Sequence, residues 1–219
     1  MYETNQAGGA NRRKSTERDG HEMVDILTIL ILAIDFGLSI WNAYASGMNI
    51  ESLRRGGGSS WMEAVAYSGL GLAYAGATYV MIIVVGFVAY AFGYVSSDVV
   101  DAAFGFDFIV FGILIIGFGL MITIQSIIVA VRRRSLGSII MAAWNIFAEI
   151  WDIAGYIEGF GEAVSMLKGV GHDERDETSL ILIVIVALLI AYFMVHAAYI
   201  HGKKKAQGLG SGSMGSSFF

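Results

Sequence analysis

Five long apolar runs dominate this chain of 219 residues and limit what it can fold into. An α-helix crosses the roughly 30 Å hydrocarbon core of a bilayer with about 20 apolar residues, and each run reaches that length. The sequence therefore predicts an all-α, polytopic integral membrane helical bundle with four to five transmembrane helices. The runs are Ile26–Ala45, Ala64–Ser97, Phe108–Val131, Leu136–Ile157 and Thr178–Gly202.

Charged residues make up only 15% of the chain and lie almost wholly outside the apolar runs. No loop reaches the roughly 50 residues that a separate soluble domain needs, so we expect no soluble domain. We expect residues 23–202 to form the transmembrane domain. Residues 1–22 are predicted to be a disordered polar tail, and residues 203–219 a flexible tail that is Lys-rich and then Gly/Ser-rich.

Two of the runs leave their path through the membrane open. Ala64–Ser97 has no charge and would be about 51 Å long as one helix. We expect a single tilted helix there, with a re-entrant pair broken near Ala75–Ala77 as the alternative. In Leu136–Ile157 the large apolar residues roughly offset one carboxylate, but not two. This run either spans with its polar face turned inward or lies in the interface as an amphipathic helix.

The distribution of Lys and Arg bears on the topology. Residues 98–107, between the second and third runs, are expected to form a loop with three Asp and no base. With five spanning runs, eight basic residues lie on one side of the membrane and six on the other. If the first run lies in the membrane plane, the split becomes twelve to two with both termini inside; if the fourth is interfacial, it is seven to seven. The positive-inside rule therefore favours a spanning fourth run and a cytoplasmic C-terminal tail. The role of the first run stays open.

Glycines recur every seven residues in the second and third runs. The chain has 28 Gly and no Pro, so close helix packing is easier to build than kinked helices. A stripe of small residues on one helix face lets a neighbouring backbone approach, and we expect residues 64–131 to form a tight hairpin with its stripes facing each other. The alternative is that Gly is simply common in membrane helices. The predicted packing residues are Gly86, Gly93, Gly105, Gly112 and Gly119.

The first and fourth runs each carry a polar stripe at helical spacing. Alternating steps of four and three keep residues on one side of a helix. A carboxylate at the centre of a membrane helix costs about 2.5–3.5 kcal/mol on insertion scales, so such stripes are expected to face other protein groups. The stripes are Thr28, Asp35, Ser39 and Asn42, and Ser138, Asn145, Glu149, Asp152 and Tyr156.

The acids of these stripes lead to a site hypothesis. No Lys or Arg lies inside an apolar run, so Asp35, Glu149 and Asp152 must be protonated, hydrated or bound to a cation. Together with His196 of the last run, they would form a proton or cation pathway, or a site for a cationic lipid or solute. The alternative is structural: Ser39 or Asn42 holds Asp35 protonated, and the two acids of the fourth run reach the headgroups.

The chain lacks the motifs of common enzymes and of metal or nucleotide sites. We expect no catalytic residues, no cofactor, no metal site and no nucleic-acid partner. The expected function is that of a non-enzymatic structural or assembly subunit of a larger membrane complex, of the secretion, respiratory or viral-envelope type. A small proton or cation channel or transporter is the alternative. Expected partners are the lipid bilayer and other membrane subunits or further copies of the chain.

Overall fold

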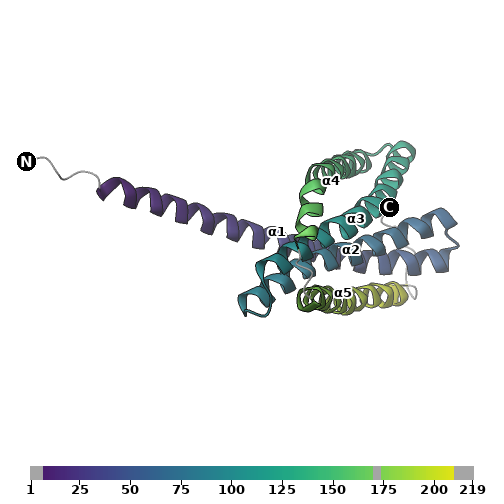
Figure 1. Ribbon diagram of the computed structural model, residues 1–219. Helices are drawn as coiled ribbons and strands as arrows, with labels where there is room; N and C mark the ends of the chain where they lie inside the picture. Colours follow the sequence, from purple (N-terminus) through teal and green to yellow (C-terminus); the bar gives the residue numbers. More distant parts are fainter. Residues whose placement is uncertain (1–6, 170–173, 210–219) are drawn as a thin grey trace, which may run out of the picture.

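A computed structural model describes the backbone of residues 7–169 and 174–209, and the side chains of residues 28–169 and 174–208. In this part of the chain there are five α-helices and no strand (Figure 1). All five are long and apolar enough to cross a membrane, which confirms the predicted all-α, multi-pass membrane class. The helices are α1 (Ala7–Gly56), α2 (Ser60–Ala91), α3 (Ser97–Arg133), α4 (Leu136–Lys168) and α5 (Glu174–Leu209).

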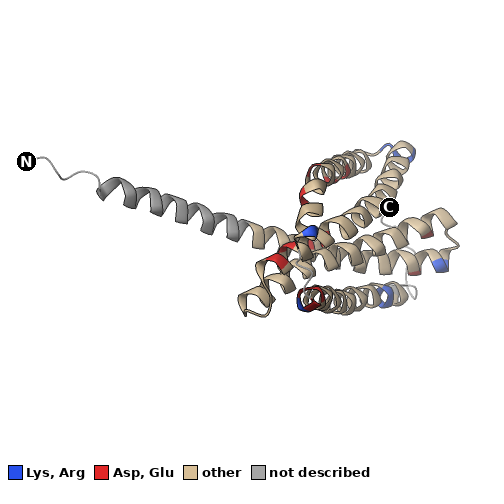
Figure 2. Ribbon diagram, viewed as in Figure 1, with Lys and Arg blue, Asp and Glu red and all other residues tan. Residues whose placement is uncertain are grey.

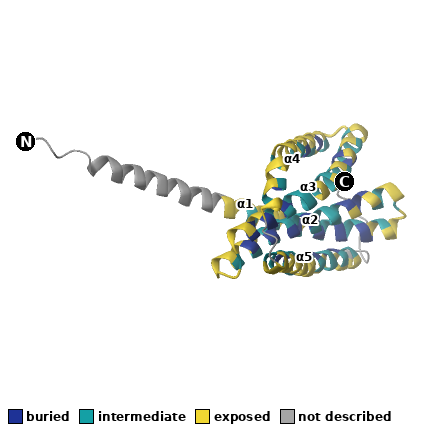
Figure 3. Ribbon diagram, in the orientation of Figure 1, coloured by how far each residue is buried: buried dark blue, intermediate teal, exposed yellow. Residues whose placement is uncertain are grey.

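Helix α2 is the centre of the bundle. It packs against α1, α3 and α5, whereas α4 packs against α3 alone among the described residues. Consecutive helices run antiparallel, so α1 and α5 run parallel and end on the same side. In Figure 3 the buried residues gather along α2 and the parts of α3 and α1 beside it, whereas α4 is mostly exposed or half-buried.

Small side chains form the core. One cluster of buried residues joins α1, α2 and α5, and another joins α2, α3 and α5. Membrane helices cannot gain from excluding water between them, so close van der Waals packing of small residues supplies the attraction. The first cluster is Ala43, Ala73, Ala77, Ala191 and Val195. The second is Ile82, Val99, Ala103, Ile183 and Ala187.

The closest helix contact joins α1 and α5. A Cβ atom added at Gly47 would overlap the main-chain carbonyl of Tyr199, and one added at Gly202 would overlap that of Tyr44. Only a residue without a side chain lets the two backbones meet at this separation. The α1–α5 pair is therefore held together by direct contact between the two main chains.

The second apolar run is one helix, as expected, but it ends earlier than predicted. Gly93 has a φ of 73°, in the left-handed region that favours glycine, so α2 stops at Ala91. The Ser96 hydroxyl then accepts a hydrogen bond from the Val99 amide and caps α3. The prediction that Gly93 packs between two helices is wrong, because this residue forms the turn.

Helix α3 starts at Ser97, eleven residues ahead of the predicted apolar run. The acids at residues 98–107 suggest a loop, yet the segment contains no Pro and a single Gly, so a helix can continue through it. Asp98 lies in the first turn, where a negative charge stabilises the helix dipole. Asp107 consequently lies inside the helix and inside the bundle.

The glycine stripe of α3 faces α4, not α2. An added Cβ would overlap the Ala163 carbonyl at Gly105, lie 2.9 Å from the Tyr156 ring at Gly112, and lie 2.5 Å from a Glu149 carboxylate oxygen at Gly119. Gly86 of α2 meets α3 only at ordinary distance, 3.6 Å from Phe104. The hairpin of α2 and α3 exists, but facing stripes do not build it, since larger residues of α3 fill the side towards α2.

The two ends of the bundle differ in charge (Figure 2). Basic residues gather where α1, α3 and α5 end; acids gather at the opposite end, at the α2–α3 turn and the start of α5. At the basic end, Glu51 is bridged to Arg55 at 3.0 Å and to Lys203 at 3.9 Å, and it accepts a hydrogen bond from Gln207. Helix α5 continues to Leu209, so the first residues of the predicted flexible tail 203–219 are helical. Residues 7–22 of the predicted disordered segment 1–22 likewise belong to α1, whereas residues 1–6 and 210–219 lie outside the described chain.

Candidate functional site

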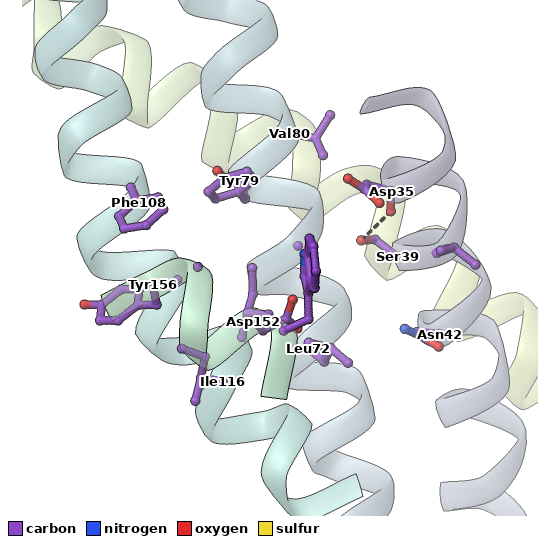
Figure 4. A pocket seen from close by; sticks show the side chains of 16 residues that line it. Asp35, Ser39, Asn42, Leu72, Tyr79, Val80, Phe108, Ile116, Asp152 and Tyr156 are labelled. Atoms are coloured by element: carbon purple, nitrogen blue, oxygen red, sulfur yellow. Dashed lines mark hydrogen bonds between the residues drawn. The ribbon is translucent and has the colours of Figure 1, made fainter. Parts of the chain in front are cut away.

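A cavity of about 480 Å³ lies between α1 and α4, floored by α2 and α3. It exists because α4 packs on α3 without reaching α1. Part of each polar stripe of the sequence lines it, so the structure brings together residues from two helices whose backbones do not pack against each other. Figure 4 shows this cavity. Its polar side chains are Asp35, Ser39, Asn42, Tyr79, Asp152 and Tyr156.

The α1 wall carries Asp35, Ser39 and Asn42 on one helix face. The Ser39 hydroxyl donates a hydrogen bond of 2.9 Å to the main-chain carbonyl of Asp35, not to its carboxylate. Ser39 packs on Gly76 of α2, where an added Cβ would lie only 2.6 Å from the hydroxyl oxygen. The wall is therefore fixed against α2, while the Asp35 carboxylate stays exposed to the cavity.

The α4 wall carries Asp152 and Tyr156, one helical turn apart. The Tyr156 ring stacks on Phe108 of α3 with centroids 5.3 Å apart, and its hydroxyl donates to the Ile109 carbonyl at 3.1 Å. Gly112 leaves the space that this ring occupies. The stacked pair anchors α4 on α3 and gives the cavity an aromatic surface, which Trp151 extends.

Asp35 and Asp152 line the same cavity, one from the α1 wall and the other from the α4 wall. No Lys or Arg is among the described residues that line it. Two carboxylates that face one cavity repel each other when both are ionised, and a cation or a proton between them relieves that repulsion. The arrangement can therefore attract a positive charge, and the aromatic rings can add cation–π attraction.

Glu149 was predicted to share this site, but it lies one turn outside the cavity lining. Its side chain is 6% exposed and packs against Gly119 of α3. One carboxylate oxygen has no hydrogen-bond partner among the described residues. Glu149 is thus enclosed in the α3–α4 contact, next to the site but separate from it.

His196, the fourth predicted site residue, lies elsewhere. Its ring stacks on Tyr192 with centroids 5.3 Å apart, and its Nδ1 atom is 3.5 Å from the Tyr74 hydroxyl. These residues form an aromatic row on α5 and α2, and none of them lines the cavity. The structure therefore joins Asp35 with Asp152 and leaves His196 apart.

Asp107 is the polar residue that the sequence argument missed. It is 1% exposed, and neither carboxylate oxygen has a hydrogen-bond partner among the described residues. The sequence assigned it to a loop because two other acids precede it. The signal that identifies it is the uninterrupted apolar sequence on both sides, Ala102–Phe106 and Phe108–Ile116, which requires a helix continuing through Asp107.

Tyr79 is the cavity residue from α2 that carries a hydroxyl group. Its ring lines the cavity, and it lies within electrostatic reach of both Asp35 and Asp107. In the view of Figure 4, the ring stands between Asp35 and Phe108, the neighbour of Asp107 on α3. Asp35 and Asp152 therefore line the cavity together with this tyrosine, whereas Asp107 lies outside the lining.

The carboxylates are too dispersed for a recognisable metal centre: in the described part of the chain, no three His, Asp or Glu side chains come together as potential ligands. Comparison with protein-family models, characterised proteins and solved structures finds no match for this chain. The function is therefore argued from the chemistry of the cavity.

Proposed function

We propose that this multi-pass membrane protein binds and carries a small organic cation, with the cavity between α1 and α4 as its binding site. The observation that supports this proposal is the pairing of Asp35 and Asp152 from opposite walls of one cavity. Intramembrane carboxylates are costly, and those that persist commonly serve an ion or substrate path. Of the functions expected from the sequence, the transporter fits this geometry better than the subunit.

The size and lining of the cavity indicate the class of ligand. Small-molecule sites typically have volumes of about 300–1,000 Å³ with mostly apolar walls and a few polar groups. A cavity of about 480 Å³ with aromatic walls fits this description. A bare ion would leave most of that space unfilled, whereas an ammonium-type cation gains from both the carboxylates and the rings. We propose a binding function without catalysis.

Binding of ethidium, a planar organic cation with its own fluorescence, tests the proposal. The purified protein in detergent should bind ethidium saturably. The double variant Asp35→Asn/Asp152→Asn should bind it at least about tenfold more weakly, since loss of about 1.4 kcal/mol corresponds to a factor of ten. Fluorescence anisotropy gives the Kd, and uptake into proteoliposomes gives the transport rate.

Glu158→Gln is the matched control. Glu158 is an exposed acid on α4 that does not line the cavity, so this variant removes the same charge from the same helix. Its Kd should equal that of the wild type. The proposal fails if the wild type shows no saturable binding, or if the double variant binds as tightly as the wild type.

One observation favours the second candidate, a subunit of a larger membrane complex. Only three residues of α4 are buried, Ala142, Glu149 and Ala163, and its exposed face includes the large apolar side chains Trp144 and Phe147. Such a surface suits either lipid or another transmembrane helix. Crosslinking in native membranes from a photoreactive group at position 147 would capture a protein partner if this candidate is correct.

We also propose that the basic end of the bundle is cytoplasmic. Arg54, Arg55, the Arg132–Arg134 run and the Lys203–Lys205 run all lie at the end where α1, α3 and α5 finish. The positive-inside rule places such an end in the cytoplasm. Protease access to a tag added after residue 219, in sealed vesicles of known orientation, tests this assignment.

A further inference from the structure

An aromatic and basic cluster lies on the surface where α1 and α5 meet. The Tyr44 ring is at its centre, with its centroid 5.8 Å from that of Trp41 on the same helix and 5.8 Å from that of His201 on α5. The Lys205 Nζ atom is 5.9 Å from the centroid of the Tyr44 ring, within cation–π distance. Tyr44 is half-buried and the other three side chains are exposed. We call Trp41, Tyr44, His201 and Lys205 the interfacial cluster.

The close contact between α1 and α5 fixes the geometry of this cluster. Gly202 lies against the main chain of Tyr44, where an added Cβ atom would overlap the carbonyl. His201 and Lys205 flank this glycine and are four residues apart, so the helix places both side chains on one side of the contact. The interfacial cluster is therefore built on two packed helices and contains no loop residue.

Lys205 differs from the nearby Lys203 in what it contacts. Lys203 lies 3.9 Å from the Glu51 carboxylate, which also pairs with Arg55 at 3.0 Å. In the described part of the chain, Lys205 forms no ion pair, and its ammonium group lies over the Tyr44 ring. The charge of Lys205 is therefore available to an anion from outside the protein.

Exposed apolar side chains continue this surface towards the middle of the membrane. On α1, Ile34 lies seven residues before Trp41; on α5, Met194 lies seven residues before His201 and Ile190 eleven before it. These spacings keep each set on one helix face. Ile34 is 52% exposed, Met194 46% and Ile190 39%. A surface that is basic at one level and apolar below it matches a lipid, whereas a soluble anion would use only the basic part.

We propose that the interfacial cluster binds the headgroup of an anionic phospholipid, whose acyl chains lie along the apolar faces of α1 and α5. The Lys205 ammonium pairs with the phosphate, and the Trp41 indole N–H can donate a hydrogen bond to headgroup oxygens. Basic residues at the ends of transmembrane helices attract anionic headgroups, and Trp and Tyr favour the headgroup level. None of the four residues lines the cavity between α1 and α4, so this site does not depend on the proposed cation function.

Native mass spectrometry of the purified protein, titrated in detergent with phosphatidylglycerol, tests this site. One phosphatidylglycerol should bind at least about tenfold more tightly than phosphatidylcholine, which carries no net charge. Lys205→Gln should weaken phosphatidylglycerol binding about fivefold, the order expected for one basic residue near anionic headgroups. Lys205→Arg keeps the charge and should bind within about twofold of the wild type. Inorganic phosphate at the concentration of the lipid should not displace it.

Arg133→Gln is the matched control. It removes one exposed positive charge from the same end of the bundle, but from α3, which does not pack against α1. Its affinity for phosphatidylglycerol should equal that of the wild type. Equal loss in Arg133→Gln and Lys205→Gln would show that only the overall charge of this end attracts the lipid, and would overturn the site. Wild-type affinity in Lys205→Gln, no preference over phosphatidylcholine, or displacement by inorganic phosphate would each overturn it as well.

Discussion

The contact between α1 and α5 and the contact between α3 and α4 use glycine in different ways. At α1–α5, Gly47 and Gly202 let the two backbones touch directly. At α3–α4, Gly105 also meets main chain, at the Ala163 carbonyl, but Gly112 and Gly119 receive side chains of α4, the Tyr156 ring and the Glu149 carboxylate. The first contact leaves no space between helices, whereas the second keeps α4 farther out and leaves a cavity beside it.

This difference explains where polar groups can reside. Backbone contact and small residues around Ala43, Ala77 and Ala191 make the α1–α2–α5 region continuous and apolar. On the other side, α4 is held by α3 alone, so its inward polar stripe meets open space instead of another helix. A membrane bundle can place carboxylates at such a point because the cavity admits water or a cation.

Gly47→Leu should lower the stability of the protein most, because the new side chain disrupts the backbone contact between α1 and α5. The new side chain would overlap the Tyr199 carbonyl, and a helix backbone cannot move aside locally. We expect a loss of about 3 kcal/mol or more in the free energy of unfolding, at the upper end for overpacking. Thermal unfolding in detergent, followed by circular dichroism, measures it. Gly37→Leu on the same helix, with nothing within 4 Å, is the control and should unfold like the wild type.

Gly112→Leu should have a smaller effect, since its neighbour is a side chain. The Tyr156 ring can rotate away, at the loss of its stacking on Phe108 and of its hydrogen bond to Ile109. We expect a destabilisation of about 1–3 kcal/mol and weaker ethidium binding, because the cavity wall shifts. Gly117→Leu on the same helix meets nothing within 4 Å and serves as the control. Equal stability of the two variants would show that the ring does not hold α4.

Glu51→Gln should have the smallest effect of the three. It removes the ion pairs that fasten the end of α1 to Lys203 and Arg55, but Gln can still accept a hydrogen bond from Gln207. Ion pairs with solvent-exposed partners contribute little to stability, so the unfolding temperature should fall only slightly. A larger loss of stability than in Gly112→Leu would reverse the order proposed here. It would show that the charged end contributes most to holding α5 in the bundle.

Much of the fold could be predicted from the pattern of apolar residues. The class, the five helices and the uninterrupted second helix follow from run length, because backbone groups in lipid must be satisfied within each helix. The errors fell at helix ends. Acids at Asp98 and Asp101 were assigned to a loop, although acids also stabilise the first turn of a helix. That choice hid Asp107.

The candidate site, like the fold, could be predicted only in part from the sequence. Helical spacing alone put Asp35 with Ser39 and Asn42, and Asp152 with Tyr156, on single faces. It could not show that the two faces share a cavity, that Tyr79 of α2 lines that cavity with them, or that His196 belongs to an aromatic row on α5. Spacing fixes directions around one helix axis, whereas the partner that each face meets depends on how all the helices pack.

The sequence by itself determined that this protein is a bundle of membrane helices with carboxylates on two of them, because bilayer thickness and helix geometry act on each segment separately. Only the tertiary structure decided that the α3 glycines receive α4 and not α2, and that α4 consequently stands away from α1. The reason is that side-chain volumes from several helices compete for the same space, and that competition created the cavity in which the acids meet.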